Sequence, residues 1–338
     1  MTMDLLPDDD QAAIAAAARD LVCSLSPLSR LHALGSSGPV ADPQLWAAAA
    51  AQGFFALDLP EDVGGAGLSL AELSLLFREL GRSLVPGPFA GTVVAARVAA
   101  AAGHGELTTR IAGGELPVGL AERIEGGLLR TFDADDAAAY LVVTPDGSAL
   151  HPADSVETVR RRPCVDVASR WAELRIVGEP LARVDAGSFD AVPYASVLVA
   201  AQLAGICAAT RDASAHYAKV RTQFGVPIGS FQAVKHRCAD EAVRAEAIDQ
   251  LVTYAALAVR DGRPEAALLW PAARTVGADH ALRNCADNIQ NHGGIGYTAE
   301  HDAHLYLKRT QVLADLLLPR EDLRAAVLAA PGTRGGST

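Results

Sequence analysis

Three long helical stretches follow one another in the second half of the chain, and they restrict the fold more than any other feature. Through residues 188–220 apolar side chains recur at helical spacing, for example at Val197, Ala201 and Ala204. Residues 231–259 and 264–289 continue the pattern, and a shorter helical pair follows to about residue 328. Helices of about 30 residues bury their apolar faces by packing lengthwise, so this part is expected to form a bundle.

The first 113 residues are also helical in pattern, and the segment after them is not. A capping box from Ser69 to Glu72 and an N-cap at Asp42 mark two helix starts. Short apolar runs predict strands at 117–120, 139–143, 155–159 and 171–176. The expected fold is mainly α with a small β domain. The expected parts are an N-terminal helical domain (1–113), a small β domain (114–186), a C-terminal helical bundle (187–330) and a disordered tail (331–338).

The net charge and the cysteine content limit the expected partners and the expected cellular compartment. The 338 residues include 29 lysine and arginine against 40 aspartate and glutamate, a net charge of −11. Such an acidic surface argues against nucleic acid or an anionic membrane as the partner. No apolar run of about 18–20 residues is free of charges and breaks, and the five cysteines form no CxxC pair. We therefore expect a soluble cytoplasmic protein with reduced thiols and no structural zinc.

Two clusters of polar residues are weak candidates for a site. His301 and His304 lie three residues apart and could face one metal ion. No third ligand accompanies them, so we interpret them as solvated helix residues and expect no metal. Residues 160–162 are three consecutive arginines that could bind a phosphate. A solvated turn explains them equally well, because adjacent side chains on a strand point to opposite faces.

Two segments between the long helices combine glycine with groups that bind nucleotides. The first, residues 221–236, reads RTQFGVPIGSFQAVKH and places Arg221, Gln223 and Phe224 at a Gly/Pro turn. A guanidinium, an amide and an aromatic ring suit a pyrophosphate and a purine. The second, residues 290–297, reads QNHGGIGY, and its glycines let backbone N–H groups approach an anion. Either segment alone could be an interhelical turn without a ligand, because a single GGxG run is a weak signal.

Together, the two segments resemble the motifs of the acyl-CoA dehydrogenase family, RxQFGxPIGxFQ after the first long C-terminal helix and QxxGGxGY later. The loop at residues 59–69, LPEDVGGAGLS, is similar to the family's PExxGGxGLS, and residues 77–82, FRELGR, resemble its helix ending in ExGR. The resemblance covers most of the chain. It implies the acyl-CoA dehydrogenase fold, with an N-terminal helical domain, a middle β domain and a C-terminal four-helix bundle.

The resemblance also implies FAD as the cofactor, bound across a subunit boundary. In that family the two motifs of one subunit hold the adenosine and pyrophosphate end of the FAD in the neighbouring subunit. The resemblance assigns the pyrophosphate contact to Arg221 and the border of the adenine to Phe224. The other implied cofactor contacts are Gln223, Gln232, Gln290, Gly293 and Gly294. These seven residues, the clamp residues, all match the family pattern.

The flavin-ring side of the family's site has no recognisable counterpart in this sequence. Family members hold the ring with a TEPxxGSD-like loop and a W-[IV]-T-N-G-like strand. Residues 119–127 and 135–140 occupy the corresponding region and contain neither motif. The resemblance therefore implies a β domain that folds without holding a flavin ring.

The family's catalytic base is also missing from its expected places. That base is a glutamate, which takes the α-proton of the acyl-CoA while hydride leaves for the flavin. Its usual position falls on Leu317, and its less common position falls near Ala195. The resemblance therefore assigns no catalytic residue to this chain. Asp315 is the fallback if the register slips, and Glu321 is the other nearby carboxylate.

An intact adenosine clamp without a ring pocket or base indicates a non-catalytic subunit. The combination resembles the short subunits of actinobacterial heteromeric (α2β2) acyl-CoA dehydrogenases of steroid side-chain degradation, which pair with a longer catalytic subunit. It implies formation of an α,β-unsaturated acyl-CoA from a bulky sterol-derived CoA thioester, with electron-transfer flavoprotein as the acceptor. The alanine-rich, lysine-poor composition is consistent with a high-GC genome.

Two alternatives stay open at this point. The chain could be a self-sufficient homo-oligomeric acyl-CoA dehydrogenase with a displaced catalytic carboxylate, such as Asp315. It could also be a flavin-free scaffold subunit that only binds a partner. The retained Arg221 and the glycine pair argue against the scaffold, which has no physical need of them.

Overall fold

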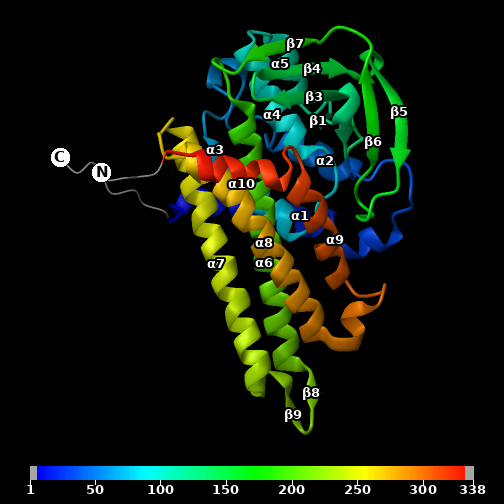
Figure 1. Cartoon of the computed structure of the whole chain (residues 1–338), viewed down its shortest axis with the longest axis vertical. Helices are drawn as coiled ribbons and strands as arrows, with labels where there is room; N and C mark the ends of the chain where they lie inside the picture. Colours follow the sequence, from blue (N-terminus) through cyan, green and yellow to red (C-terminus); the bar gives the residue numbers. More distant parts are fainter. Residues whose placement is uncertain (1–5, 332–338) are drawn as a thin grey trace, which may run out of the picture.

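The structure is a computed structural model that describes residues 6–331, most of them helical (Figure 1). Beyond Pro331, the tail expected at 331–338 lies outside the described residues. The helices are α1 (Asp9–Leu25), α2 (Pro43–Ala51), α3 (Leu70–Arg82), α4 (Phe89–Ala101), α5 (Gly105–Ala112), α6 (Ala191–Val220), α7 (Gln232–Arg260), α8 (Ala266–His292), α9 (Ala303–Asp315) and α10 (Arg320–Ala329).

Local sequence signals determine several helix starts. The Asp8 carboxylate accepts a hydrogen bond from the Gln11 N–H, and the Gln11 side chain accepts one from the Asp8 N–H, a capping box that opens α1. Ser69 and Glu72 form the expected capping box of α3. Asp42 caps α2, whose first residue is proline. Only α5 was not expected from the sequence.

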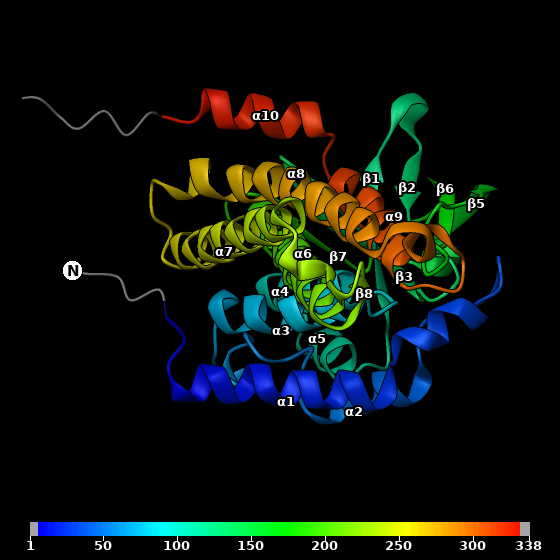
Figure 2. The same cartoon turned by 90° about the horizontal axis from the view of Figure 1, so that it is seen from below.

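The helices are stacked in layers, with α6 in the middle (Figure 2). α1 packs against α3 and α2 lies beside α1, and α3 packs against α6. On its other side α6 packs against α7 and α8, and α10 covers α8. α3 and α6 touch backbone to backbone, because a Cβ atom added to Gly205 would lie 2.0 Å from the Arg78 carbonyl oxygen. Only glycine fits at this crossing.

Helix α6 is apolar over most of its surface because other elements surround it. By length and composition it could cross a membrane, with a mean hydropathy of 1.7 over its most apolar 18 residues. This corrects the expectation that no apolar run would be long enough. Of that window, 89% is buried inside the protein, which is the condition of a core helix.

Seven of the described strands form one sheet, beside the upper end of the bundle in Figure 1, and the other two form a separate hairpin described below. The strands of the sheet are β1 (Val118–Arg123), β2 (Leu129–Thr131), β3 (Ala139–Thr144), β4 (Gly147–Pro152), β5 (Val156–Arg162), β6 (Trp171–Ile176) and β7 (Ala182–Asp185). Their order is β5-β6-β2-β1-β3-β4-β7, and only the β1–β3 pair is parallel. β2, β4 and β7 were not predicted from the sequence.

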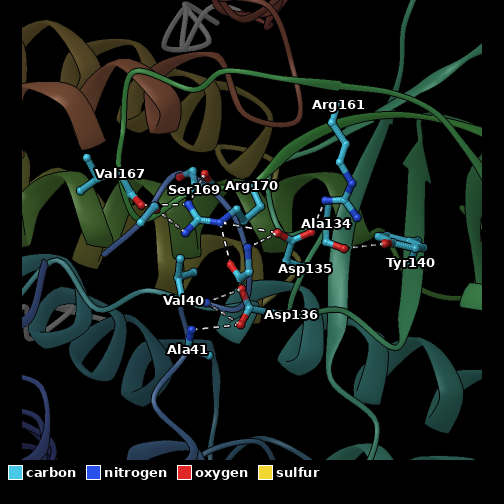
Figure 3. Close-up of polar contacts among 12 residues, drawn as sticks. Val40, Ala41, Ala134, Asp135, Asp136, Tyr140, Arg161, Val167, Ser169 and Arg170 are labelled. Carbon is cyan, nitrogen blue, oxygen red and sulfur yellow. Dashed lines mark hydrogen bonds and ion pairs between the residues drawn. The ribbon is translucent and has the colours of Figure 1, made fainter. Parts of the chain in front are cut away.

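A buried polar network connects the sheet to the N-terminal segment (Figure 3). The Arg170 guanidinium donates to the carbonyl oxygens of Gly35 and Gly38 at 2.9 and 2.7 Å. The Asp136 carboxylate accepts from the N–H groups of Val40 and Ala41, both at 3.0 Å. These bonds satisfy loop backbone groups that have no partner in regular structure, so they position the β domain against the N-terminal helices.

Candidate functional site

The end of α6 carries the first of the two predicted binding segments. Arg221 is the C-cap of α6, and its side chain is exposed. A short hairpin follows, made of β8 (Thr222–Gln223) and β9 (Val226–Pro227), at the lower tip of the bundle in Figure 1. Gln232 begins α7 directly after the hairpin and is also exposed. The guanidinium and the two amide side chains therefore lie at one end of the bundle, open to a ligand.

Phe224 adopts an unusual conformation at the tip of this hairpin. Its φ is 51°, Gly225 follows with a φ of 80°, and together they form the two-residue loop between β8 and β9. Such a loop normally takes asparagine or glycine, because a left-handed residue with a large side chain costs about 1–2 kcal/mol. The phenyl ring is 92% exposed. A strained and solvated aromatic ring points to a ligand or a partner that covers it.

The end of α8 carries the second binding segment. Gln290 is exposed in the last turn, and the chain then continues into a 3-10 helix, η6 (Gly293–Tyr297). Gly293 has a φ of 64°, a left-handed conformation that favours glycine. A Cβ atom at Gly293 or Gly294 would meet nothing within 4 Å, so the backbone here is open to close approach. This arrangement suits an anion held by N–H groups.

The structure brings the two segments to the same end of the bundle (Figure 1). The Tyr217 ring, one turn before Arg221, lies 4.3 Å from the His292 ring, centroid to centroid, and His292 directly precedes Gly293. The Tyr217 carbonyl also accepts the Arg221 N–H at 2.9 Å. The stacked rings therefore connect the helix ends that carry the two halves of the clamp.

Exposed apolar side chains gather around the clamp residues. In a folded protein, apolar groups that cluster on one exposed surface mark a contact with a partner or ligand. The exposed large apolar residues of this end are Val220, Phe224, Val226, Phe231, Ile295 and Tyr297. This end of the bundle is therefore a candidate subunit contact as well as a candidate cofactor site.

A second polar cluster joins the β1–β2 hairpin to the turn after α9. The buried Glu122 carboxylate pairs with the Arg130 guanidinium, whose Nη2 donates to the Asp315 carbonyl oxygen at 3.1 Å. Burial raises the pKa of the Glu122 carboxyl, and the Arg130 hydrogen bond and charge lower it. Residues 119–127, which lack the family's ring motif, therefore lie near the end of α9, just before the base position at Leu317. The paired side chains of Glu122 and Arg130 connect the two segments.

Arg274 completes this cluster from α8. It is fully buried, and its Nη2 donates to the carbonyl oxygens of Leu313 and Leu316 at 3.1 and 2.8 Å. Nε and Nη1 have no hydrogen-bond partner among the described residues. Burial lowers the pKa of this guanidinium to about 10, while the Glu122 charge raises it. We name Glu122, Arg130 and Arg274 the ring-side cluster.

The predicted base positions hold no acid. Leu317 is buried with a φ of 73°, and Ala195 is buried in α6. Asp315 and Glu321 are both exposed, at the end of α9 and the start of α10. The structure therefore offers neither carboxylate a closed, dry pocket of the kind that a general base uses.

The histidine pair and the three consecutive arginines, the two weak candidates, contact other parts of the protein. The His301 ring lies 4.4 Å from His292, and His304 Nε2 contacts the Ala299 carbonyl oxygen at 3.2 Å. Among residues 6–331, no group of three or more ligands could hold a metal ion. The consecutive arginines lie on β5, where Arg162 pairs with a glutamate of β6 and Arg161 pairs with an aspartate of the β2–β3 connection.

Sequence reasoning missed the buried charged residues. Glu122, Glu241 and Arg274 are all buried, at 5%, 0% and 0% exposure. Nothing in the local sequence marks these charges as buried, because β1 is buried on both faces and the pattern along α7 and α8 is only weakly amphipathic. A charge that interrupts a buried face is costly unless it is paired, so it marks a feature that the fold maintains.

Comparison with known proteins supports the assignment of both helical parts. A model of the acyl-CoA dehydrogenase N-terminal domain matches residues 8–111, and one of the C-terminal domain matches residues 191–315. The chain is 37% identical to acyl-CoA dehydrogenase FadE34 of Mycobacterium tuberculosis over 291 residues, 81% of this chain. It spans only 40% of the length of FadE34.

Two further proteins match over almost their whole length. Acyl-CoA dehydrogenase IpdE2 of Mycobacterium tuberculosis is 35% identical and is covered to 97%, with 95% of this chain. Among solved structures, the Tcur3481-Tcur3483 steroid ACAD matches with a TM-score of 0.82 and 25% identity, over 94% of this chain and 96% of that one. The predicted fold is confirmed. The chain belongs to the acyl-CoA dehydrogenase family of oxidoreductases, whose cofactor is FAD.

Proposed function

We propose that this chain is the non-catalytic subunit of a heteromeric FAD-dependent acyl-CoA dehydrogenase. It would hold the adenosine and pyrophosphate end of an FAD whose ring lies in a longer catalytic subunit, in an assembly with two copies of each. The observation that carries the proposal is the contrast between the clamp residues and the ring-side cluster. The clamp residues lie open at the end of the bundle, whereas in the ring-side cluster the Glu122 carboxylate is buried and pairs with Arg130, and the buried Arg274 donates to two backbone carbonyls.

The clamp residues fit the diphosphate end of the cofactor. Arg221 offers a planar guanidinium for charge-assisted hydrogen bonds to the pyrophosphate. Gln223, Gln232 and Gln290 offer amide donors and acceptors, and the open backbone at Gly293 and Gly294 offers N–H groups. The exposed Phe224 ring would border the adenine. Bound FAD supplies the hydride acceptor of the reaction.

The ring-side cluster does not fit a flavin ring or a base. A general base must reach the reacting C–H in a dry pocket. Leu317 has no acidic group, and the buried Glu122 already pairs with Arg130. The partner subunit would therefore supply both the ring pocket and the glutamate base. This chain would bind the cofactor, orient it and complete the subunit contact around Phe224.

The substrate and the remaining partners follow from the relatives. The Tcur3481-Tcur3483 steroid ACAD, named for two proteins and for steroids, is 25% identical to this chain. This supports a bulky sterol-derived CoA thioester as substrate and a two-subunit assembly. As in the family, electron-transfer flavoprotein is the proposed electron acceptor, and the cytoplasm is the proposed location.

The flavin content of the purified assembly tests the proposal. We expect one FAD for every two chains, measured by flavin absorbance against protein concentration after gel filtration. This chain expressed alone should dehydrogenate no acyl-CoA. A full complement of one FAD per chain, or turnover by this chain alone, would instead establish the self-sufficient homo-oligomeric enzyme. An active assembly that retains its FAD when Arg221, Gln290 and Phe224 are all replaced by alanine would establish a scaffold subunit that does not contact the flavin.

A further inference from the structure

Glu241 is a buried acid at the centre of the helical bundle, and the proposed function does not use it. Its side chain lies in α7 with 0% exposure, between α6 and α8. None of the ion pairs among the described residues includes it. Its partners are neutral: Ser214 Oγ of α6 lies 2.7 Å from Oε1, and Asn291 Nδ2 of α8 lies 3.3 Å from Oε2.

These partners connect the helix ends that carry the clamp residues. Ser214 lies two helical turns before Arg221 on α6, and Asn291 directly follows Gln290 on α8. The Asn291 amide oxygen also accepts from Arg237 Nη1 at 2.8 Å, about one turn into α7 after Gln232. One carboxyl group therefore joins the final turns of α6 and α8 to the first turns of α7.

Counting hydrogens shows which form of Glu241 the site accepts. The Ser214 hydroxyl has a single proton, but it contacts two acceptors, Glu241 Oε1 and the Asn288 amide oxygen at 3.1 Å. If Glu241 is protonated, its O–H donates to Ser214 and Ser214 donates to Asn288, so every group is satisfied. With the Asn288 amide oxygen facing Ser214, an ionised Glu241 leaves one of the two acceptors buried without a donor. The geometry is that of a neutral carboxylic acid.

The charged and titratable neighbours agree with this reading. Burial raises the pKa of Glu241 to about 8, the Ser214 hydrogen bond lowers it, and the Asp287 charge of α8 raises it. Arg244 and Arg237 of α7 lower this pKa, but both pair with Asp287. The nearby thiols are Cys238 and Cys285, whose pKa values are raised by burial, for Cys285 to about 12. Burial lowers the pKa of the His292 imidazole, which follows Asn291.

We propose that Glu241, in its neutral form, is the positioning residue that holds the two halves of the cofactor clamp in register, and that loss of its proton releases the cofactor. The inference rests on the proposed function, because it assumes that Arg221 and Gln290 hold the diphosphate end. It adds a pH limit to that function. Retention of the diphosphate end should be constant up to about neutral pH and should then fall as Glu241 ionises.

Titration of the full-length chain with ADP tests this inference, since ADP carries the adenosine and diphosphate groups that the clamp would hold. We expect the ADP affinity of the wild type, measured by calorimetry, to fall about tenfold between pH 7 and pH 9, the factor for a neutral form that titrates near pH 8. The terminal phosphate of ADP loses its second proton at about pH 6, so its added negative charge above pH 7 is small and would strengthen binding rather than weaken it.

Three variants separate positioning from a general structural role. Glu241→Gln keeps the shape and cannot ionise, so its ADP affinity should match the neutral wild type and stay flat to pH 9. Glu241→Met removes the hydrogen bonds and should bind ADP weakly at every pH. Glu246→Gln, on the exposed side of the same helix, is the matched control and should keep the wild-type profile.

The possible failures are distinguishable. A flat wild-type profile, or a Glu241→Gln profile that falls like the wild type, would overturn the role of Glu241 and leave the proposed function standing. A wild type that binds no ADP at any pH would overturn the clamp itself and this inference with it. If Glu241→Met does not fold, the comparison between wild type and Glu241→Gln still decides.

Discussion

Asp166 of the β domain and Arg309 of α9 form a buried ion pair, with 2.5 Å between Oδ2 and Nε. Arg309 Nη1 also donates to the Val85 carbonyl oxygen at 3.1 Å, in the segment between α3 and α4. One guanidinium therefore connects α9 to two other parts of the chain. Because both side chains are less than 10% exposed, the charge of each depends on the other.

Removing one member of this ion pair should destabilise the folded chain. We expect Asp166→Ala to lower the free energy of unfolding by about 3–5 kcal/mol, because Arg309 is left buried without a counter-charge. Urea unfolding followed by circular dichroism measures the change. Asp154→Ala, at an exposed aspartate of the same domain, is the control and should stay within about 0.5 kcal/mol of wild type.

Cofactor retention should depend on Arg221. A charge-assisted hydrogen bond to a diphosphate contributes about 1.5–3 kcal/mol, so Arg221→Ala should weaken FAD retention tenfold or more. Flavin absorbance after gel filtration of the assembly reports the loss. Arg110→Ala removes an exposed arginine of α5 and should retain the wild-type amount of flavin. Equal flavin in both variants would remove Arg221 from the clamp.

The carboxylates near the family's base position should be dispensable. Deleting a general base costs about 10²–10⁴-fold in rate, whereas Asp315→Asn and Glu321→Gln should leave turnover of the assembly within a few-fold of wild type. Leu317→Glu should create no activity in this chain alone, because the proton acceptor would have no flavin ring beside it. Loss of turnover in either carboxylate variant would make that residue the displaced base.

The crossing of α3 and α6 should not tolerate a methyl group. Gly205→Ala places Cβ against the Arg78 carbonyl oxygen, and we expect destabilisation by about 1–3 kcal/mol or more. Gly105→Ala is the matched control, because its Cβ would meet nothing within 4 Å at the start of α5. The control should be neutral or more stable by up to about 1 kcal/mol. Thermal unfolding of the two variants compares them directly.

The pH dependence of the free energy of unfolding should also show whether Glu241 is protonated in the folded chain. The pKa of this carboxyl is raised on folding from about 4.5 to about 8, so its favourable contribution is complete below pH 4.5 and is lost as pH rises to 8. Glu241→Gln does not titrate. Its stability relative to wild type should therefore increase from pH 5 to pH 8 and level off above. A difference that does not vary with pH would mean that Glu241 is ionised throughout.

The sequence predicted the long helices because their signals are local. Capping residues at Asp42 and Ser69 and apolar spacing along α6 are readable without knowledge of the fold. The short strands β2, β4 and β7 were missed because three to six residues give little periodicity, and their pairing partners supply the stabilisation. Strand β4, for example, follows a turn at Asp146 and pairs on both sides.

The positions of the proposed clamp residues could be read from motifs in the sequence. The packing around these residues could not. Arg221 and Gly293 stand in recognisable motifs, but the stacking of Tyr217 on His292 depends on how α6 meets α8. The ring-side cluster depends on contacts between segments more than 140 positions apart, from Glu122 on β1 to Arg274 on α8. A single sequence shows that such charges exist but does not show how they pair.

The central position of α6 has a consequence for how the chain unfolds. Its side chains share one hydrophobic core with α3 and α4 before the sheet and with α7 and α8 after it. If α3, α4, α7 or α8 lost its structure, this helix would be exposed to water. The two helical regions, separate in sequence, therefore behave as one cooperative unit, and amide protons in α3 and α8 should exchange through the same global opening.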